Sequence, residues 1–431
     1  RPPPARPFPP AGSHPAALAR HPRSLVFFHV SLVPVIGVVG EEKTKPTQHS
    51  VQNLMAAGLT PDFLVCRSTQ PLAASTKNKL ALFCHVPSEH CLGAPAIAAA
   101  AAARGARLSP PLLPSLGVHD VSNIYRVPLL LHHQGATANM LARLQLTQLT
   151  SAGFLNEWIA LAELVDSLTQ VAKIAVVGKY TDLSDAYLSV SKALQHASFA
   201  AERKLKIVWI EAADLADETM TSEPAAHAEA WAKLKGADGI LVPGGFGDRG
   251  VEGKIAAVRY ARESKVPFFG ICLGFQVAVI EFARSQLGHA DAHSAEFSKE
   301  TKHPMVVFMP EVSRTHMGGT MRLGARRTVL SRPTCVTAQL YGGVTAFDER
   351  HRHRYEVNIE YVKSLEAKGL EFVGRDTTGE RMEVFELANH PYFVGCQFHP
   401  EFKSRPMKAS PLFLGLLLAA SGQPIPAVDA K

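Results

Sequence analysis

Cys272 lies between Gly270 and Gly274 in the stretch GICLGFQ. The apolar block before it, VPFFGI, predicts a buried strand of a parallel sheet, and the apolar spacing after it predicts a helix packed on that strand. Cys272 would then stand on a tight strand-to-helix turn. There, flanking glycines permit a strained backbone, and the free N–H groups of the helix start favour a thiolate. This is the thiol counterpart of a nucleophile elbow, although a buried structural cysteine also fits G-x-C-x-G.

A histidine and a glutamate follow near the far end of the chain, in FVGCQFHPEFKSRP. The proline between His399 and Glu401 favours extended geometry, in which residues i and i+2 point the same way, so Glu401 can orient an imidazole that activates Cys272. A surface histidine and glutamate would give the same H-P-E pattern by themselves. With Cys272, and with Gly244 and Gly245 on a loop able to supply a backbone donor, the pattern predicts a Cys-His-Glu triad.

Alternating strands and helices must position these groups. From residue 171 onward, strands such as VAKIAVVGKY, LKIVWIEAADL and ILVPGG alternate with helices such as DAYLSVSKALQHASFAAERK and GKIAAVRYARES. This alternation predicts an α/β fold with a doubly wound, mostly parallel sheet, whose ligands bind at the carboxyl ends of the strands. Both VPGGFGDRG and Cys272 fall at such ends.

The chain divides into five predicted parts. In the first half, LVFFHVSLVPVI and DFLVCRS predict strands, SVQNLMAAGL predicts a helix, and STKNKLALFCHV predicts a helix that leads into a short strand. The parts are a disordered or non-native head at 1–24, a partial α/β domain at 25–150 with a low-complexity insertion at 88–117, a helical linker at 151–172, a second α/β domain at 173–422 and a tail at 423–431.

Composition excludes several classes of function. Of the formal charge of +7, four positive charges are Arg1, Arg6, Arg20 and Arg23, in a head without acidic residues. The rest of the chain is only mildly basic, so we expect a solvated surface and no nucleic-acid partner. No apolar run is long enough to span a membrane, so no membrane partner is expected. The six cysteines form no C-x-x-C pair, which favours a reducing, cytoplasmic location and argues against disulfides and a structural metal.

The stretch GICLGFQ followed by FHPE resembles the class I glutamine amidotransferases, and longer motifs narrow the resemblance to the CTP synthase family. The motifs are LVPGGFGDRGVEGKI, MGGTMRLG, ERHRHRYEVN and HPEFKSRP, with EEKTKPTQHSV, KLALFCHV and VHDVSNIYRVPLLL upstream. They cover about 25–87 and 118–422. The resemblance implies a flavodoxin-like amidotransferase domain, preceded by part of a P-loop-NTPase-like amidoligase domain.

The resemblance also implies residue roles. Cys272 would be the nucleophile that forms a γ-glutamyl thioester, His399 the general base and acid, and Glu401 its orienter. The backbone N–H groups of Gly245 and Leu273 would form the oxyanion hole. The expected glutamine contacts are Gly245, Leu273, Gly274, Phe275, Gln276, Glu296 and Arg354. Phe275 stands where the family more often has methionine, a swap of similar volume. The charges of Glu296 and Arg354 suit a zwitterionic amino acid.

In the upstream half, the family aminates C4 of UTP with ammonia after ATP has phosphorylated the oxygen there. The UTP and CTP contacts would be the loop KTKPTQ, namely Lys43, Thr44, Lys45, Pro46, Thr47 and Gln48, together with Lys79. The ATP contacts would be His119, Asp120 and Val121. Without the other motifs, a solvated lysine-rich loop would be the better explanation of KTKPTQ.

The chain departs from the family pattern in one respect. It contains no G-x-x-x-x-G-K-S/T phosphate loop, and the expected acidic ligands for Mg²⁺ are missing. For the full-length family we expect ATP and Mg²⁺ as cofactors, GTP as an activator, and homotetramers and filaments. For this chain we expect glutaminase activity, which needs no cofactor, without CTP synthesis.

Two alternatives remain open. The first is a free-standing glutaminase subunit; the segment KTKPTQHSV counts against it, because such a subunit does not bind a uridine nucleotide. The second, a non-catalytic regulatory or filament subunit of CTP synthase, would not need the complete set of Cys272, His399 and Glu401.

Overall fold

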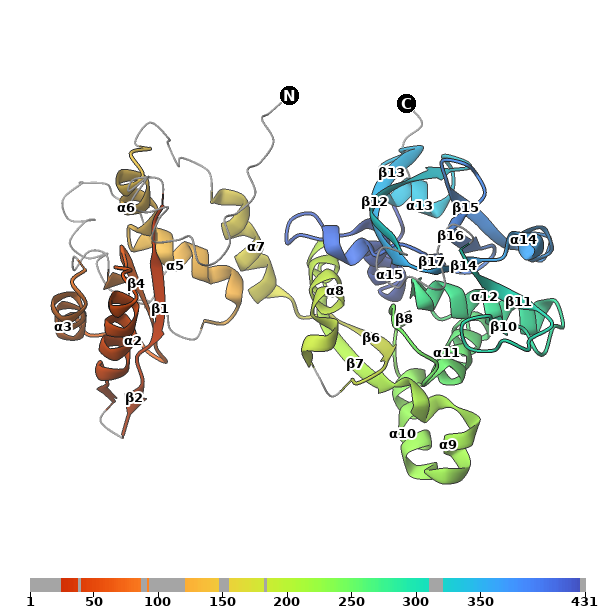
Figure 1. The fold of residues 1–431 in the computed structure, drawn as a ribbon, viewed down its shortest axis with the longest axis horizontal. Helices are drawn as coiled ribbons and strands as arrows, with labels where there is room; N and C mark the ends of the chain where they lie inside the picture. Colours follow the sequence, from red (N-terminus) through yellow and green to blue (C-terminus); the bar gives the residue numbers. More distant parts are fainter. Residues whose placement is uncertain are drawn as a thin grey trace. The chain divides into compact units, whose positions relative to one another are not determined.

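The computed structural model describes residues 25–37, 40–86, 91–92, 121–146, 155–181, 184–309 and 321–426. The chain forms two compact units, residues 1–166 and 167–431, and each is described by itself (Figure 1). The predicted head, most of the predicted insertion, and His119 and Asp120 lie outside the described residues.

Unit 1 contains a three-stranded parallel sheet in the order β1-β4-β5. The predicted helices SVQNLMAAGL and STKNKLALFC are found, but the short strand predicted at His85 and Val86 is not. Its small core includes Val33, Val51, Leu64 and Leu80. Its strands are β1 (Phe28–Leu32), β2 (Val35–Ile36), β3 (Glu41–Glu42), β4 (Phe63–Arg67) and β5 (Cys91–Leu92). Its helices are α2 (Lys45–Ala56), α3 (Ala74–Cys84), the 3-10 helix η3 (Ile124–Arg126), α5 (Val127–His133), α6 (Ala136–Arg143) and α7 (Asn156–Ser167).

The segment KTKPTQ is not the loop that we predicted. Lys45 begins α2, and Pro46 lies in its first turn. The fixed φ of proline suits this position, and its missing N–H would have no helical partner there. The last four residues of the segment are therefore helical.

Unit 2 contains a nine-stranded sheet in the order β13-β12-β15-β16-β17-β9-β8-β6-β7. From β17 to β7 all four pairings are parallel, which confirms the predicted doubly wound α/β fold. From β13 to β17 all four are antiparallel. The sequence patterns did not resolve this second half of the sheet.

The elements of unit 2 follow one another along the chain as strands and helices. The strands are β6 (Val171–Gly178), β7 (Lys204–Glu211), β8 (Gly239–Val242), β9 (Phe268–Ile271), β10 (His293–Ser294), β11 (Pro304–Phe308), β12 (Arg322–Leu330), β13 (Ala346–His353), β14 (Tyr355–Val357), β15 (Leu370–Asp376), β16 (Met382–Leu387) and β17 (Phe393–Cys396). The α-helices are α8 (Leu188–Ala200), α9 (Asp217–Ser222), α10 (Pro224–Lys235), α11 (Val251–Glu263), α12 (Leu273–Gln286), α13 (Val336–Leu340), α14 (Ile359–Glu366) and α15 (Pro411–Ala420). The 3-10 helices are η4 (Ser184–Tyr187), η5 (Ala212–Leu215) and η6 (Pro400–Lys403).

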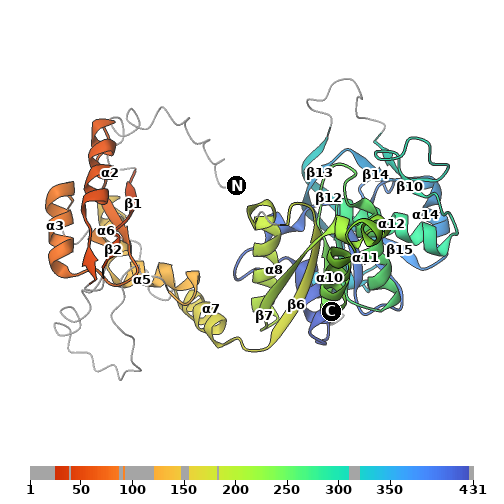
Figure 2. The ribbon, with the colours of Figure 1, turned by 90° about the horizontal axis from the view of Figure 1, so that it is seen from below.

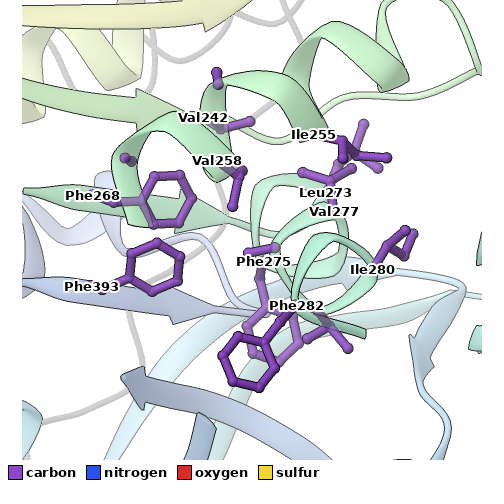
Figure 3. Packing of buried hydrophobic residues seen from close by; sticks show 14 of the residues in the cluster. Val242, Ile255, Val258, Phe268, Leu273, Phe275, Val277, Ile280, Phe282 and Phe393 are labelled. Atoms are coloured by element: carbon purple, nitrogen blue, oxygen red, sulfur yellow. The ribbon is translucent and has the colours of Figure 1, made fainter. Parts of the chain in front are cut away.

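Helices cover both faces of the parallel strands. Successive strand residues point to opposite faces, so Ile240 packs in the cluster with α11 and α12, whereas Leu241 packs in the cluster with α8 and α15. Figure 2 shows α8 and α11 on opposite sides of β6 and β7. In Figure 3, Phe268 of β9 and Phe393 of β17 lie side by side, with ring centroids 4.6 Å apart. The two clusters hold the parallel strands rigidly between them.

The register of β9 and β17 brings two distant segments together. Cys396 pairs with Ile271, so the residues after each strand leave the sheet at the same edge. Cys272 follows β9, and the segment with His399 follows β17. Parallel pairing thus joins parts of the chain more than a hundred residues apart.

The glycines beside Cys272 have a different role from the predicted one. Neither has a positive φ; Cys272 itself does, at 52°. A Cβ on Gly270 would lie 2.7 Å from the carbonyl carbon of Gly274, and a Cβ on Gly274 would overlap the carbonyl oxygen of Val242. Both glycines therefore allow α12 to approach β8 and β9 closely.

We predict that Gly274→Ala destabilises unit 2 by about 2–3 kcal/mol, because the new methyl group meets the backbone of Val242, which cannot rotate away. A thermal melt should show a Tm lower by roughly 5–10 °C. Gly236→Ala is the matched control, since its nearest neighbour would be the carbonyl oxygen of Ala232 at 3.3 Å. Equal melting curves for the two variants would contradict this account of Gly274.

Candidate active site

Cys272 occupies the turn between β9 and α12. Its φ of 52° and ψ of −99° are unusual for a residue with a side chain. Its N–H donates to the carbonyl oxygen of Cys396 at 2.8 Å, and its own carbonyl accepts from the N–H of Gln276 at 3.1 Å. The residue is 9% exposed. This geometry puts the thiol at the positive end of the dipole of α12, as the sequence predicted.

His399 and Glu401 form a close pair. His399 Nδ1 lies 2.8 Å from Glu401 Oε1, so the predicted pairing is found. The predicted extended geometry is wrong, because Pro400 and Glu401 begin the 3-10 helix η6 and His399 precedes it. Burial alone would lower the pKa of His399, but hydrogen bonding to Cys272 and Glu401 raises it to about 10. A Cβ on Gly244 would lie 2.9 Å from His399 Cε1 and 3.3 Å from Cys272 Cβ, so this glycine leaves room for both side chains. The three predicted triad residues therefore lie together.

Two glutamines extend this group. Gln397 Nε2 lies 3.6 Å from Cys272 Sγ, and Gln276 Nε2 donates to Gln397 Oε1 at 3.0 Å and to the carbonyl of Tyr355 at 3.0 Å. Sequence reasoning missed Gln397. Its place directly after a strand that runs parallel to β9 is the signal that could have identified it.

A lysine holds the loop after β8. Lys179 Nζ donates to the carbonyl oxygens of Phe246 at 2.9 Å and Gly247 at 2.6 Å. Burial lowers the pKa of Lys179, and the carboxylates of Asp248, Glu211 and Glu296 counteract this. The loop contains Gly244 and Gly245, so Lys179 restrains the segment that carries a predicted oxyanion donor. Sequence reasoning missed this residue too.

A second lysine, Lys254 on α11, is fully buried beneath the same loop. Its Nζ lies 3.7 Å from the position that a Cβ would take on Gly245. Among the described residues it has no hydrogen-bond partner. Burial, together with the nearby charge of Lys179, lowers the pKa of Lys254 to about 7. Lys254 therefore loses much of its charge near neutral pH.

The remaining predicted glutamine contacts have different environments. Phe275 is in the core, stacked on Phe385 at 5.1 Å, so only its backbone is available to a ligand. Leu273 and Gln276 are also buried. Burial raises the pKa of Glu296, whereas the charge of Arg354 lowers it. Glu296 and Arg354 are thus electrostatic neighbours, both partly exposed.

The predicted nucleotide contacts belong to unit 1. Lys45 and Pro46 are exposed, as is Lys79 on α3. Lys43 pairs with Glu41 at 2.6 Å, and Gln48 Nε2 donates to Thr44 Oγ1 at 3.1 Å. Thr47 is fully buried and accepts a hydrogen bond from Ser31 at 2.9 Å. Val121 is partly buried.

None of the helices in the described part of the chain has the length and apolar character of a membrane span. Within the same residues, no group of histidine, cysteine, aspartate or glutamate side chains is arranged to hold a metal ion.

Comparison with known proteins places these features in a class. Residues 182–419 match the family described as glutamine amidotransferase class-I. The glutaminase domain of Trypanosoma brucei CTPS, solved with bound acivicin, superposes with a TM-score of 0.54 at 39% identity, covering 59% of this chain and 97% of that one. Unit 2 is therefore a class I glutamine amidotransferase domain.

The other comparisons identify the family. Residues 15–102 match the family described as CTP synthase N-terminus. The chain is 52% identical to CTP synthase of Dictyostelium discoideum over 410 residues, which cover 91% of this chain. It is 50% identical to human CTP synthase 1 over 396 residues, which cover 92% of this chain. It belongs to the CTP synthase family. It spans 68% of the Dictyostelium protein and 63% of the human one.

We predict that Lys254→Met stabilises unit 2 by about 2–4 kcal/mol at pH 6.5, because it removes a buried ammonium. The pKa of Lys254 is about 7 in the folded chain and near 10.4 when unfolded. Between these values the unfolded chain binds more protons, so wild-type stability rises with pH and the advantage of the variant shrinks. Thermal melts from pH 6.5 to 9.5 measure this.

Lys363→Met, at an exposed position on α14, is the control and should give no pH-dependent gain. A gain for Lys254→Met that stays constant with pH would contradict the lowered pKa.

Proposed function

We propose that this chain hydrolyses glutamine at Cys272 and that, in the complete enzyme, the ammonia aminates UTP to CTP at the expense of ATP. The observation that carries the first part is Cys272, with its positive φ, on the turn at the start of α12, with the His399 and Glu401 pair beside it. Membership of the CTP synthase family supports the second part.

The proposed chemistry has two stages. The thiolate of Cys272, whose proton is held by His399, attacks the side-chain carbonyl carbon of glutamine, and the N–H groups of Gly245 and Leu273 stabilise the oxyanion. His399 gives its proton to the departing nitrogen, so ammonia leaves and a γ-glutamyl thioester remains. His399 then takes a proton from water, whose oxygen attacks the thioester. The C–S bond breaks, glutamate leaves after its new carboxyl group gives its proton to solvent, and the Cys272 thiolate again lies beside a protonated His399. A pKa of about 10 keeps His399 protonated and ready for the first transfer.

We also propose that two side chains of opposite charge bind the two charged groups of glutamine. The carboxylate of Glu296 would bind the ammonium group of glutamine, and the guanidinium of Arg354 would bind its carboxylate. Arg354 Nε has no hydrogen-bond partner among the described residues, which leaves a donor for such a ligand.

The match of residues 15–102 to the CTP synthase N-terminus favours this function over a free-standing glutaminase subunit. We propose that KTKPTQ and Lys79 contact UTP and CTP, and that Val121, with the preceding His119 and Asp120, contacts ATP. Mg²⁺, activation by GTP, and tetramers or filaments are proposed for the complete enzyme on the same family ground. The reduced Cys66, Cys84, Cys272, Cys335 and Cys396 support a cytoplasmic location.

We predict that acivicin, the compound bound in the trypanosome glutaminase domain, modifies Cys272 covalently. Peptide mass spectrometry should find the adduct on Cys272, and excess glutamine should slow its formation about tenfold or more. Cys272→Ala is the control and should take up none. An adduct on the buried Cys396, or on no cysteine, would rule out the proposed nucleophile.

The purified chain is expected to release glutamate from glutamine without forming CTP. Phosphoryl transfer depends on groups that position and neutralise phosphate, and these 431 residues contain no phosphate loop. The assay supplies UTP, ATP, Mg²⁺ and either glutamine or ammonia, and measures glutamate and CTP. CTP formation from ammonia by this chain alone would contradict the expectation; a full-length family member is the positive control.

A further inference from the structure

A buried carboxyl group, Glu401, contacts the imidazole of His399, and a second one, Glu349, is an electrostatic neighbour of Glu401. Glu401 uses one oxygen, Oε1, to hold His399. Glu349 on β13 is 2% exposed, and its Oε1 accepts a hydrogen bond from Tyr341 at 3.0 Å. The second oxygen of each group, Oε2, is buried and has no hydrogen-bond partner among the described residues. A buried oxygen without a donor is costly, so two of them together need an explanation.

The backbone fixes the two groups as neighbours. The N–H of His399 donates to the carbonyl oxygen of Arg350 at 2.8 Å, and Lys403 Nζ donates to that of Asp348 at 2.6 Å. Residues 348–350 of β13 thus run beside residues 399–403. Alternation along β13 turns Glu349 inward, whereas Asp348 and Arg350 are exposed. Glu349 therefore faces the Glu401 segment from inside the protein.

The charges around Glu349 favour a proton on one of the pair. Burial raises the pKa of Glu349 most, Lys403 and Tyr341 lower it, and the charge of Glu401 raises it, to about 7. Lys403 and Glu401 face it from η6, Tyr341 from α13, and the buried Cys396 from β17. Lys403 Nζ is 3.6 Å away and half exposed, so it offsets only part of the repulsion.

We propose that Glu349 holds a proton and donates it from its Oε2 to Oε2 of Glu401, as a positioning residue that fixes Glu401 against His399. The single proton satisfies both orphaned oxygens and leaves one negative charge on the pair. The inference rests on the proposed glutaminase function. When Glu349 ionises, the donor is lost and a second negative charge appears beside Glu401, so His399 is less well oriented.

Glu349→Gln tests the proposal, because its amide N–H₂ can replace the donor permanently while its oxygen still accepts from Tyr341. At pH 6 the kcat for glutamine hydrolysis should be within about twofold of wild type, and at pH 8.5 about threefold above it. Glu349→Leu is similar in size but has no donor, so its kcat should fall about tenfold or more with little change in KM.

Glu386→Gln is the matched control. Glu386 is also a buried carboxyl, but it accepts from Thr337 at the start of α13 and not from the catalytic pair. Its kcat relative to wild type should not vary with pH. Thermal melts of all variants separate loss of folding from loss of orientation.

Two results would overturn the inference. One is an equal kcat for the folded Glu349→Leu and Glu349→Gln variants, whether both keep or both lose activity. The other is a ratio of the Glu349→Gln kcat to the wild-type kcat that does not change with pH. Failure of wild type itself to hydrolyse glutamine would instead refute the proposed function.

Discussion

The close approach of α12 to β8 and β9 is the constraint on which the site depends. Gly270 and Gly274 remove the two side chains that would hold the helix away from the strands. The chain then turns within a single residue, and Cys272 must take a positive φ. Such a conformation costs on the order of 1–3 kcal/mol for a residue with a Cβ, and it persists because the surrounding packing leaves no alternative. That packing consists of two buried clusters, one on each face of the sheet.

The sheet changes from parallel to antiparallel pairing at β17, and this change assembles the site. On one side β17 runs parallel to β9, which brings the ends of both strands to one edge and sets His399 beside Cys272. On its other side it runs antiparallel to β16, and the antiparallel half continues to β13. A backbone hydrogen bond from the N–H of His399 to the carbonyl oxygen of Arg350 on β13 links the parallel half of the sheet to the antiparallel half. The orientation of the histidine thus depends on both halves.

Buried polar groups gather around this edge. Lys254, Glu349 and His353 are each almost completely buried, and each has a side-chain atom with no hydrogen-bond partner among the described residues. Burial lowers the pKa of Lys254 and of His353 and raises that of Glu349. Such groups reduce stability, and their concentration near a nucleophile is typical of active sites. Within unit 2, the apolar core therefore supplies the stability, whereas the buried polar groups at this edge of the sheet reduce stability and surround the reactive groups.

The sequence by itself determined the α/β alternation, the turn at Cys272 and the pairing of His399 with Glu401. These follow from local rules: the periods of strands and helices, glycine's lack of a side chain beside the cysteine, and the short separation of His399 and Glu401. The extended geometry predicted around Pro400 is wrong, because Pro400–Lys403 forms a 3-10 helix. Only the tertiary structure decided that KTKPTQ begins a helix, that Phe275 points into the core, and that Gln397, Lys179, Lys254 and Glu349 surround the site. These positions depend on strand register and on the order of strands in the sheet. Both arise from contacts between residues far apart in the chain, which no local pattern contains.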